Sequence, residues 1–368
     1  MVRGVTVFGW VVLAGLLACS SREKSASDAT VDRTLDGAVS DGDGGDLCAC
    51  STGRHNDRVF LLSDDGELWT FDPETRAFDF VVGPICSGMQ PFSMAVDARG
   101  IAHVVFAESL AILTLDVNDP GPCEDSGYLR RNQDFGLFGM SFASESETDF
   151  CADLYVHTYD GEGPFEEGPG LGRLGVIDAD DYSLRELAII DFDGGELTGT
   201  GDGRLFAFAG ANPVKLIEYD KSSGAVIEVV PLDGIQKTNA SAAAFYGGDI
   251  YLFTEAVPAA CNTCLMQGCQ ASLDACRGEP GCAEDLDCAL AEGDIRDECG
   301  GLLPADLQAC LGACDASCGV APQFRTSQVV RFDLDAPNGN RTFETTVAEG
   351  PIRVVGAASS PCVLTGPF

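Results

Sequence analysis

Basic residues and histidine are scarce in this sequence. Its 368 residues include 22 Lys and Arg against 58 Asp and Glu, with only 3 His, so the formal net charge is −36. A protein that binds phosphate backbones needs clustered Lys and Arg, and this composition therefore excludes nucleic acid as a partner. Strong acidity keeps a chain soluble but does not by itself indicate a function.

Catalytic signatures are missing as well. The sequence has no Gly-x-Ser-x-Gly, no His-Glu-x-x-His, no phosphate-binding loop and no dinucleotide fingerprint. None of the three histidines, His55, His103 and His157, stands in a motif, so we expect structural roles for them. Because carboxylates are abundant, an acid/base pair could still form at the centre of the folded molecule. The sequence favours a non-enzymatic protein and leaves catalysis open.

The apolar run at the N-terminus is too short to cross a bilayer, which takes ~20 residues. It extends from Val5 to Ala18 and follows the basic residue Arg3. This pattern is typical of an export signal that is later removed, and it predicts a signal peptide over residues 1–18.

The next residues suggest a lipid anchor. The segment Leu16-Leu-Ala-Cys19-Ser20 resembles the bacterial lipobox, which implies that Cys19 is acylated and holds the chain at a membrane. Ser20, where an Asp would favour retention at the inner membrane, implies the outer membrane, on its periplasmic or surface side. An ordinary signal peptide with an incidental cysteine is the alternative. Residues 19–47 have almost no large apolar side chains, so we expect a disordered acidic tether after the lipidated cysteine.

Cysteine usage fits export to an oxidising compartment. The chain has 17 Cys, and assigning Cys19 to the lipid leaves an even number for disulfides. Both subsets of these cysteines are even, which predicts two self-contained sets of disulfides. The first set is Cys48, Cys50, Cys86, Cys123, Cys151 and Cys362; the second is Cys261, Cys264, Cys269, Cys276, Cys282, Cys288, Cys299, Cys310, Cys314 and Cys318.

An internal repeat runs through the body of the chain. Five apolar segments end on an aspartate that is followed by turn residues and a further strand, and we expect each aspartate to cap its turn. With two more strand signals upstream, each unit has four short strands, the pattern of a β-propeller blade. The five aspartates are Asp72, Asp116, Asp178, Asp220 and Asp333.

The ends of the chain complete one blade in this scheme. The first strand of each unit is rich in small residues, as expected near a crowded central axis; these strands are residues 92–95, 138–141, 197–200 and 240–244. Residues 352–359 form another such strand, without partners. We therefore predict an all-β propeller over residues 48–255 and 326–368, with five four-stranded blades closed by the C-terminal strand. Six blades is the alternative.

The closure also predicts disulfides. Cys362 follows the last strand and Cys48 and Cys50 precede its expected neighbour, so we predict a bond from Cys362 to one of the two. We further predict that Cys123 pairs with Cys151, which leaves Cys86 for the remaining N-terminal cysteine.

Residues 256–325 interrupt the last blade. Pro304 suits a first helical turn, and Leu307, Cys310 and Cys314 recur at helical spacing, so we predict a small α-helical insertion stapled by disulfides. Zinc bound at Cys261-Asn-Thr-Cys264 is the rival interpretation. The block resembles Cys-rich helical modules of exported myxobacterial proteins.

The propeller body resembles the quinoprotein-like, NHL-like and YncE-like propellers in its strand-Asp-turn-Gly-strand pattern, as in Tyr219-Asp-Lys-Ser-Ser-Gly224. These propellers include enzymes, scaffolds and ligand binders, so the resemblance does not select a function. We expect no cofactor. The alternative is a calcium ion on a rim of acidic loops, as in calcium-dependent propeller lactonases; the loop residues are Asp119, Asp180, Asp181 and Asp335.

Taken together, the sequence predicts a lipid-anchored cell-envelope protein with a non-enzymatic binding or scaffold propeller. The expected partners are the membrane, through the lipid, and other envelope proteins or glycans. A calcium-dependent propeller hydrolase or lactonase is the first alternative. The second is an outer-membrane assembly factor, which no motif supports.

Overall fold

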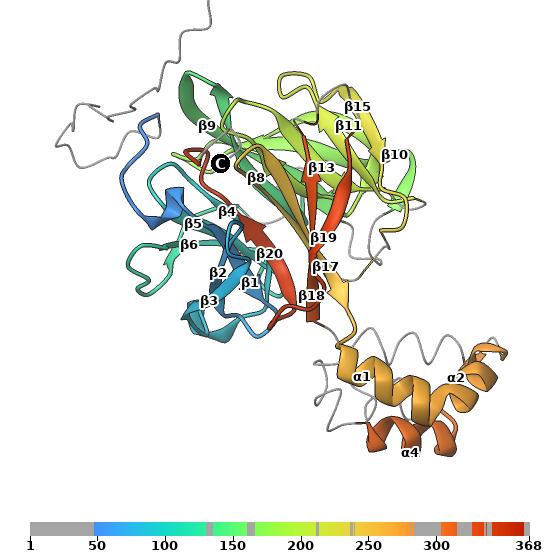
Figure 1. Ribbon diagram of the computed structural model, residues 1–368. Helices are drawn as coiled ribbons and strands as arrows, with labels where there is room; N and C mark the ends of the chain where they lie inside the picture. Colours follow the sequence, from blue (N-terminus) through green and yellow to red (C-terminus); the bar gives the residue numbers. More distant parts are fainter. Residues whose placement is uncertain are drawn as a thin grey trace, which may run out of the picture. The chain divides into compact units, whose positions relative to one another are not determined.

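The computed structural model describes residues 48–129, 135–159, 166–210, 213–235, 238, 240–279, 281–282, 303–314, 326–334, 336 and 341–363. These residues form five four-stranded antiparallel sheets, the blades of a β-propeller (Figure 1). The predicted all-β class and the count of five blades rather than six are therefore confirmed. The predicted Cys19, Cys288, Cys299 and Cys318 lie outside the described residues.

The blades are named in chain order, and the strands of each are given from the inside of the ring outwards. Blade 1 contains β20 (Val354–Ala358), β1 (Val59–Ser63), β2 (Leu68–Asp72) and β3 (Ala77–Val82). Blade 2 contains β4 (Pro91–Val96), β5 (Ile101–Phe106), β6 (Ile112–Asp116) and β7 (Glu124–Asp125). Blade 3 contains β8 (Leu137–Ser146), β9 (Asp149–Tyr159), β10 (Glu166–Ile177) and β11 (Leu184–Asp193). Blade 4 contains β12 (Glu196–Gly199), β13 (Leu205–Ala209), β14 (Lys215–Tyr219) and β15 (Val226–Pro231), and blade 5 contains β16 (Ser241–Tyr246), β17 (Asp249–Ala256), β18 (Thr326–Asp333) and β19 (Phe343–Val347).

The innermost strands close the ring. Strand β20 contacts β4, β4 contacts β8, β8 contacts β12, β12 contacts β16, and β16 returns to β20. All five are the small-residue segments that the sequence predicted to lie nearest the axis. Their small side chains are needed: a Cβ at Gly199 of β12 would overlap the carbonyl oxygen of Phe142 on β8.

The C-terminal strand joins the N-terminal one, as predicted. Strand β20 pairs antiparallel with β1, with Ala357 opposite Leu61, so the first blade combines the two ends of the described chain (Figure 1). Aromatic packing supports the closure, because the ring of Phe71 in blade 1 lies 5.6 Å from that of Phe253 in blade 5 in an edge-to-face arrangement. The closed ring leaves no inner strand without a neighbour.

The repeated aspartates cap their turns in four of the five blades. Asp72, Asp116, Asp178 and Asp220 each accept, through Oδ1, a hydrogen bond from the backbone N–H two residues further along. Side-chain hydrogen bonds from Ser222 and Ser223 lower the pKa of Asp220 to about 2. The structural interpretation of this repeat is confirmed for these four residues.

Three disulfides staple the propeller: Cys50–Cys362, Cys48–Cys151 and Cys86–Cys123. The predicted bond from Cys362 to Cys48 or Cys50 is confirmed. The predicted Cys123–Cys151 pair is wrong, and so is the expectation that Cys86 takes the remaining N-terminal cysteine. Cys123 directly precedes β7, the outermost strand of blade 2, and there it reaches the linker between blades 1 and 2 that carries Cys86.

Short helices lie between β17 and β18 in the sequence. They are α1 (Ala259–Cys264), a π-helical turn (Leu265–Cys269), α2 (Gln270–Arg277) and α4 (Ala305–Ala313). Leu273, Leu307 and Leu311 form their own small core, and the disulfides Cys264–Cys314, Cys269–Cys310 and Cys276–Cys282 join the segments. Cys261 is also disulfide-bonded. Both cysteines of the proposed zinc motif are therefore oxidised. None of the described helices is long and apolar enough to span a membrane.

Candidate functional site

The five blades meet at a pocket on one end of the propeller axis. Its cavity volume is about 170 Å³, and every blade contributes to its wall. We call it the axial pocket. Residues that define it are Val355 and Arg353 from blade 1, Phe92 from blade 2, Tyr159 from blade 3, Glu196 from blade 4 and Ser241 from blade 5.

A buried carboxyl group lies at the wall of the axial pocket. Glu196 opens β12, and only 7% of its surface is exposed. Ser93 of β4 donates a hydrogen bond of 3.0 Å to Glu196 Oε2 and accepts one of 3.1 Å from the backbone N–H of Met140 on β8. Three blades are thus connected by one chain of hydrogen bonds at the axis.

Burial changes the ionisation of this group. Removal from water raises the pKa of Glu196 to about 8, and the hydrogen bond from Ser93 offsets only part of this effect. The carboxyl is therefore mostly protonated at neutral pH.

Glycines make the burial of Glu196 feasible. Strand β8 passes close to the start of β12, and a Cβ at Gly139 would overlap the carbonyl oxygen of Gly195 and crowd the Cα of Glu196. A Cβ at Gly195 would in turn meet the ring of His157. Gly194 has a φ of 74°, which lets the chain turn sharply from β11 into β12. The sequence Gly194-Gly195-Glu196 thus brings an acidic side chain to a crowded axis.

An arginine that also lines the pocket is held by two carboxylates. Arg353, just before β20, donates to Glu255 Oε1 from Nε at 2.7 Å, and its Nη2 lies 2.6 Å from the same oxygen. Its Nη1 lies 3.4 Å from Asp64 Oδ2. Burial raises the pKa of Asp64, against the attraction of Arg353. When both carboxylates are ionised, this group of three carries a net negative charge.

Two aromatic rings line the pocket as well. Phe92 of β4 and Tyr159 at the end of β9 are stacked, with ring centroids 5.2 Å apart and an interplanar angle of 16°. The two side chains give the pocket an aromatic wall, and aromatic rings attract cations that lie over their faces.

The three histidines are all buried, and none lines the axial pocket. His157 has its pKa lowered by burial to about 4, so it is neutral at physiological pH. His103 accepts or donates at Nδ1 a 3.0 Å hydrogen bond with the Tyr182 hydroxyl, and its Nε2 lies 3.7 Å from Asp97.

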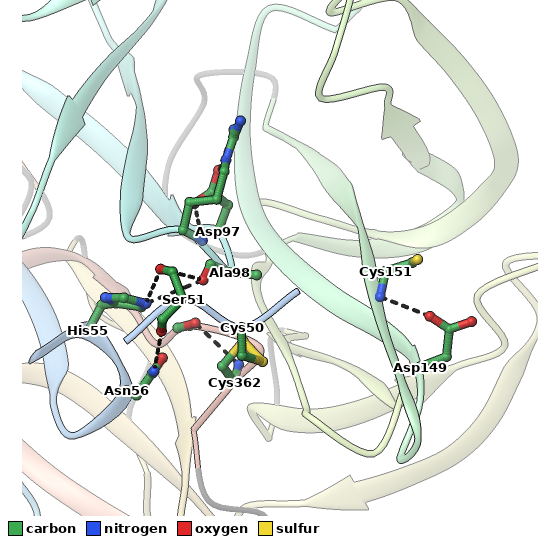
Figure 2. The surroundings of a disulfide bond; sticks show 11 residues. Cys50, Ser51, His55, Asn56, Asp97, Ala98, Asp149, Cys151 and Cys362 are labelled. Carbon is green, nitrogen blue, oxygen red and sulfur yellow. Dashed lines mark hydrogen bonds and ion pairs between the residues drawn. A yellow bond between two sulfur atoms is a disulfide. The ribbon is translucent and has the colours of Figure 1, made fainter. Parts of the chain in front are cut away.

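His55 holds the segment before β1 in place beside the Cys50–Cys362 disulfide (Figure 2). Its Nε2 lies 3.3 Å from both Ser51 Oγ and the carbonyl oxygen of Ala98, and its Nδ1 lies 3.1 Å from Asn118 Nδ2. The same Nδ1 lies 3.2 Å from Asn118 Oδ1, so the ring contacts both polar atoms of the Asn118 amide. These contacts join His55 and Ser51 to Ala98 and Asn118 in the loops of blade 2, and the cluster serves as a clamp.

The acidic loops show no cation site in the part of the chain that is described. Asp180 and Asp181 follow the capped turn at Asp178, and Asp335 lies outside the described residues. Within the described ranges, no three His, Cys, Asp or Glu side chains are grouped to hold a metal.

The sequence predicts the inner strands but does not predict which residues form the axial pocket. Ser93 stood in a recognised small-residue strand, and Glu196 directly precedes another. A lone acid at the start of a strand expected near the axis was the available signal. Arg353 had no such signal, because its partners Glu255 and Asp64 lie far away in the sequence.

No protein-family model matches the chain, and no curated protein sequence matches it. Among solved structures, the chain is similar to one in the nidogen/laminin complex, with a TM-score of 0.36 and 11% identity over 53% of this chain and 84% of that chain. It is also similar to Kuenenia stuttgartiensis hydrazine synthase, with a TM-score of 0.35 and 13% identity over 78% of this chain and 65% of that one. For streptogramin B lyase the TM-score is 0.32 and the identity 14%, covering 54% and 62% of the two chains. Similarities this weak say nothing about ligand or activity.

Proposed function

We propose that this chain is a lipid-anchored cell-envelope protein whose propeller binds a ligand at the axial pocket without transforming it. One observation carries the binding function: residues from all five blades converge on a single pocket with a buried carboxyl and an aromatic wall. Pockets with apolar walls and a few oriented polar groups are typical of ligand sites.

The set of acidic groups favours binding over hydrolysis. Hydrolysis with two carboxyl groups needs an acid and a base on opposite sides of the scissile bond. Among the described residues that line the axial pocket, Glu196 is the one carboxyl, and the nearby Glu255 and Asp64 are engaged by Arg353. The pocket therefore offers an acid without a free partner base.

The envelope location rests on the sequence. The signal over residues 1–18, the lipobox cysteine Cys19 and the tether that follows support lipid attachment, and the disulfides are consistent with an oxidising compartment. Labelling with radioactive palmitate in a bacterial host tests this part. Wild-type protein should carry label and sediment with membranes, whereas Cys19→Ser should carry no label and be released. Equal labelling of both would refute attachment at Cys19.

The binding function is tested with the unlipidated mature chain carrying Cys19→Ser. We expect fragments of envelope glycans or peptides to raise its unfolding temperature saturably, and substitution of pocket residues to remove the effect. The alternative function predicts turnover of lactone or ester substrates that requires added calcium and is abolished by chelation. Such turnover would replace the binding proposal with the hydrolase.

A further inference from the structure

The axial pocket combines features that suit one chemical class of ligand. Glu196 lines the pocket and is more than nine-tenths buried. Its Oε2 accepts a hydrogen bond from the Ser93 hydroxyl. A carboxyl group buried in this way is costly to ionise unless a positive charge lies beside it.

The surroundings supply no positive charge to Glu196. Arg353 is engaged by Glu255 and Asp64, and His157 behind Gly195 is neutral. No other charged group shifts the ionisation of Glu196 beyond burial and the Ser93 hydrogen bond. The titratable residues on the strands that contact β12 are Glu145 on β8, Asp149, Asp153, Tyr155, His157 and Tyr159 on β9, and Tyr246 on β16.

A cation would complete this arrangement. Its positive charge would favour ionisation of Glu196, and it would lie in the same pocket as the stacked rings of Phe92 and Tyr159, whose π-systems attract cations. An anion would meet Glu196 inside the pocket, and the charge of the lining residue Arg353 is already paired with Glu255 and Asp64. A neutral polyol would leave Glu196 protonated and would gain nothing from the charge of its carboxylate. The −36 charge of the chain also draws cations toward the protein.

We propose that the axial pocket binds a small organic ammonium ion between the carboxylate of Glu196 and the Phe92–Tyr159 wall. This inference rests on the proposed binding function and names the class of ligand. Binding requires Glu196 to release its proton, so affinity is coupled to pH.

The test uses calorimetric titration of the unlipidated mature chain with three probes. Choline and ethanolamine are cations, and 3,3-dimethyl-1-butanol is the neutral isostere of choline. We expect at least one cation to bind with a dissociation constant that improves about tenfold between pH 6 and pH 7, with release of about one proton at pH 7. The neutral isostere should bind at least tenfold more weakly.

Glu196→Gln keeps the size of the side chain and removes its charge. This variant should lose at least tenfold in cation affinity and all of the pH dependence, whereas Glu124→Gln, which removes an exposed carboxylate on β7, should bind as wild type. Thermal unfolding of each variant checks that it is folded.

Two outcomes overturn the inference. One is the absence of saturable binding by both cations to folded wild-type protein. The other is equal binding of the neutral isostere or of Glu196→Gln. Neither would overturn the proposed binding function, which fails only if glycan and peptide fragments also leave the protein unaffected.

Discussion

Cys50 and Cys362 form a disulfide across 312 residues of sequence, and it ties the segment before β1 to the segment after β20 within a single blade. Strands β1 and β20 are otherwise joined only by hydrogen bonds and packing. The disulfide therefore gives the closure of the ring a covalent link, and the His55 clamp beside it holds the same N-terminal segment (Figure 2).

Replacing both Cys50 and Cys362 by serine should destabilise the propeller. The cross-link restricts a far longer loop than Cys86–Cys123, whose separation is 37 residues, so the unfolded chain should gain more entropy on its removal. We expect a loss of about 2 to 5 kcal/mol in the free energy of unfolding, measured by urea denaturation, and a smaller loss for Cys86→Ser with Cys123→Ser. A larger loss from the shorter loop would contradict the role of the closure.

Glu196 should make stability fall as the pH rises. Its pKa is about 8 in the folded protein against an ordinary value of 4.5, so between these values the folded state holds a proton that the unfolded state has released. The free energy of unfolding should therefore decrease from pH 4.5 to pH 8 by roughly 4 to 5 kcal/mol through this group, and level off above. Glu196→Gln should lack this decrease and exceed wild type in stability at pH ~9. Urea denaturation across this range measures it, and equal slopes in both proteins would refute the assignment.

The fold was predictable from the sequence because its determinants are local and repeated. Four of the five turn aspartates accept hydrogen bonds from N–H groups two residues away, and small residues mark each inner strand. Asp72 or Ala243 could therefore be interpreted without knowledge of the rest of the chain. The closure could be predicted because residues 352–359 form a strand without partners and the first blade lacks its inner strand, so each completes the other.

The pairing of Cys123 and the composition of the pocket depend on long-range geometry. Cys123 meets Cys86 because β7 lies at the outer edge of its blade, and the strand pattern alone does not fix which loops become neighbours there. Glu196 is buried at the axis and accepts a hydrogen bond from Ser93, which lies 103 residues earlier in the sequence. Such contacts appear only when the blades are placed around the axis.

His157 should make the folded protein less stable as the pH falls, whereas Glu196 makes it less stable as the pH rises. Its pKa is about 4 in the folded protein against an ordinary value of 6.5, so the unfolded state binds the extra proton between these values and stability falls as the pH drops. This contribution, about 3 kcal/mol, offsets that of Glu196 between pH 4.5 and pH 6.5. Unfolding of His157→Gln should therefore expose a steeper rise in stability toward low pH than wild type shows. A profile that parallels wild type would contradict the neutral, buried state of His157.

Gly139→Ala should separate two inner strands and disturb the axial pocket at once. The added Cβ would overlap the Gly195 carbonyl and press on the Glu196 backbone, and neither can move without shifting β12. We expect a loss of about 1 to 3 kcal/mol in stability, typical of overpacking, together with a lower pKa for Glu196 as water reaches it. Gly136→Ala is the matched control, because nothing lies within 4 Å of its added Cβ. If Gly139→Ala unfolds like this control and keeps the same pH dependence, the close approach of β8 and β12 is not what buries Glu196.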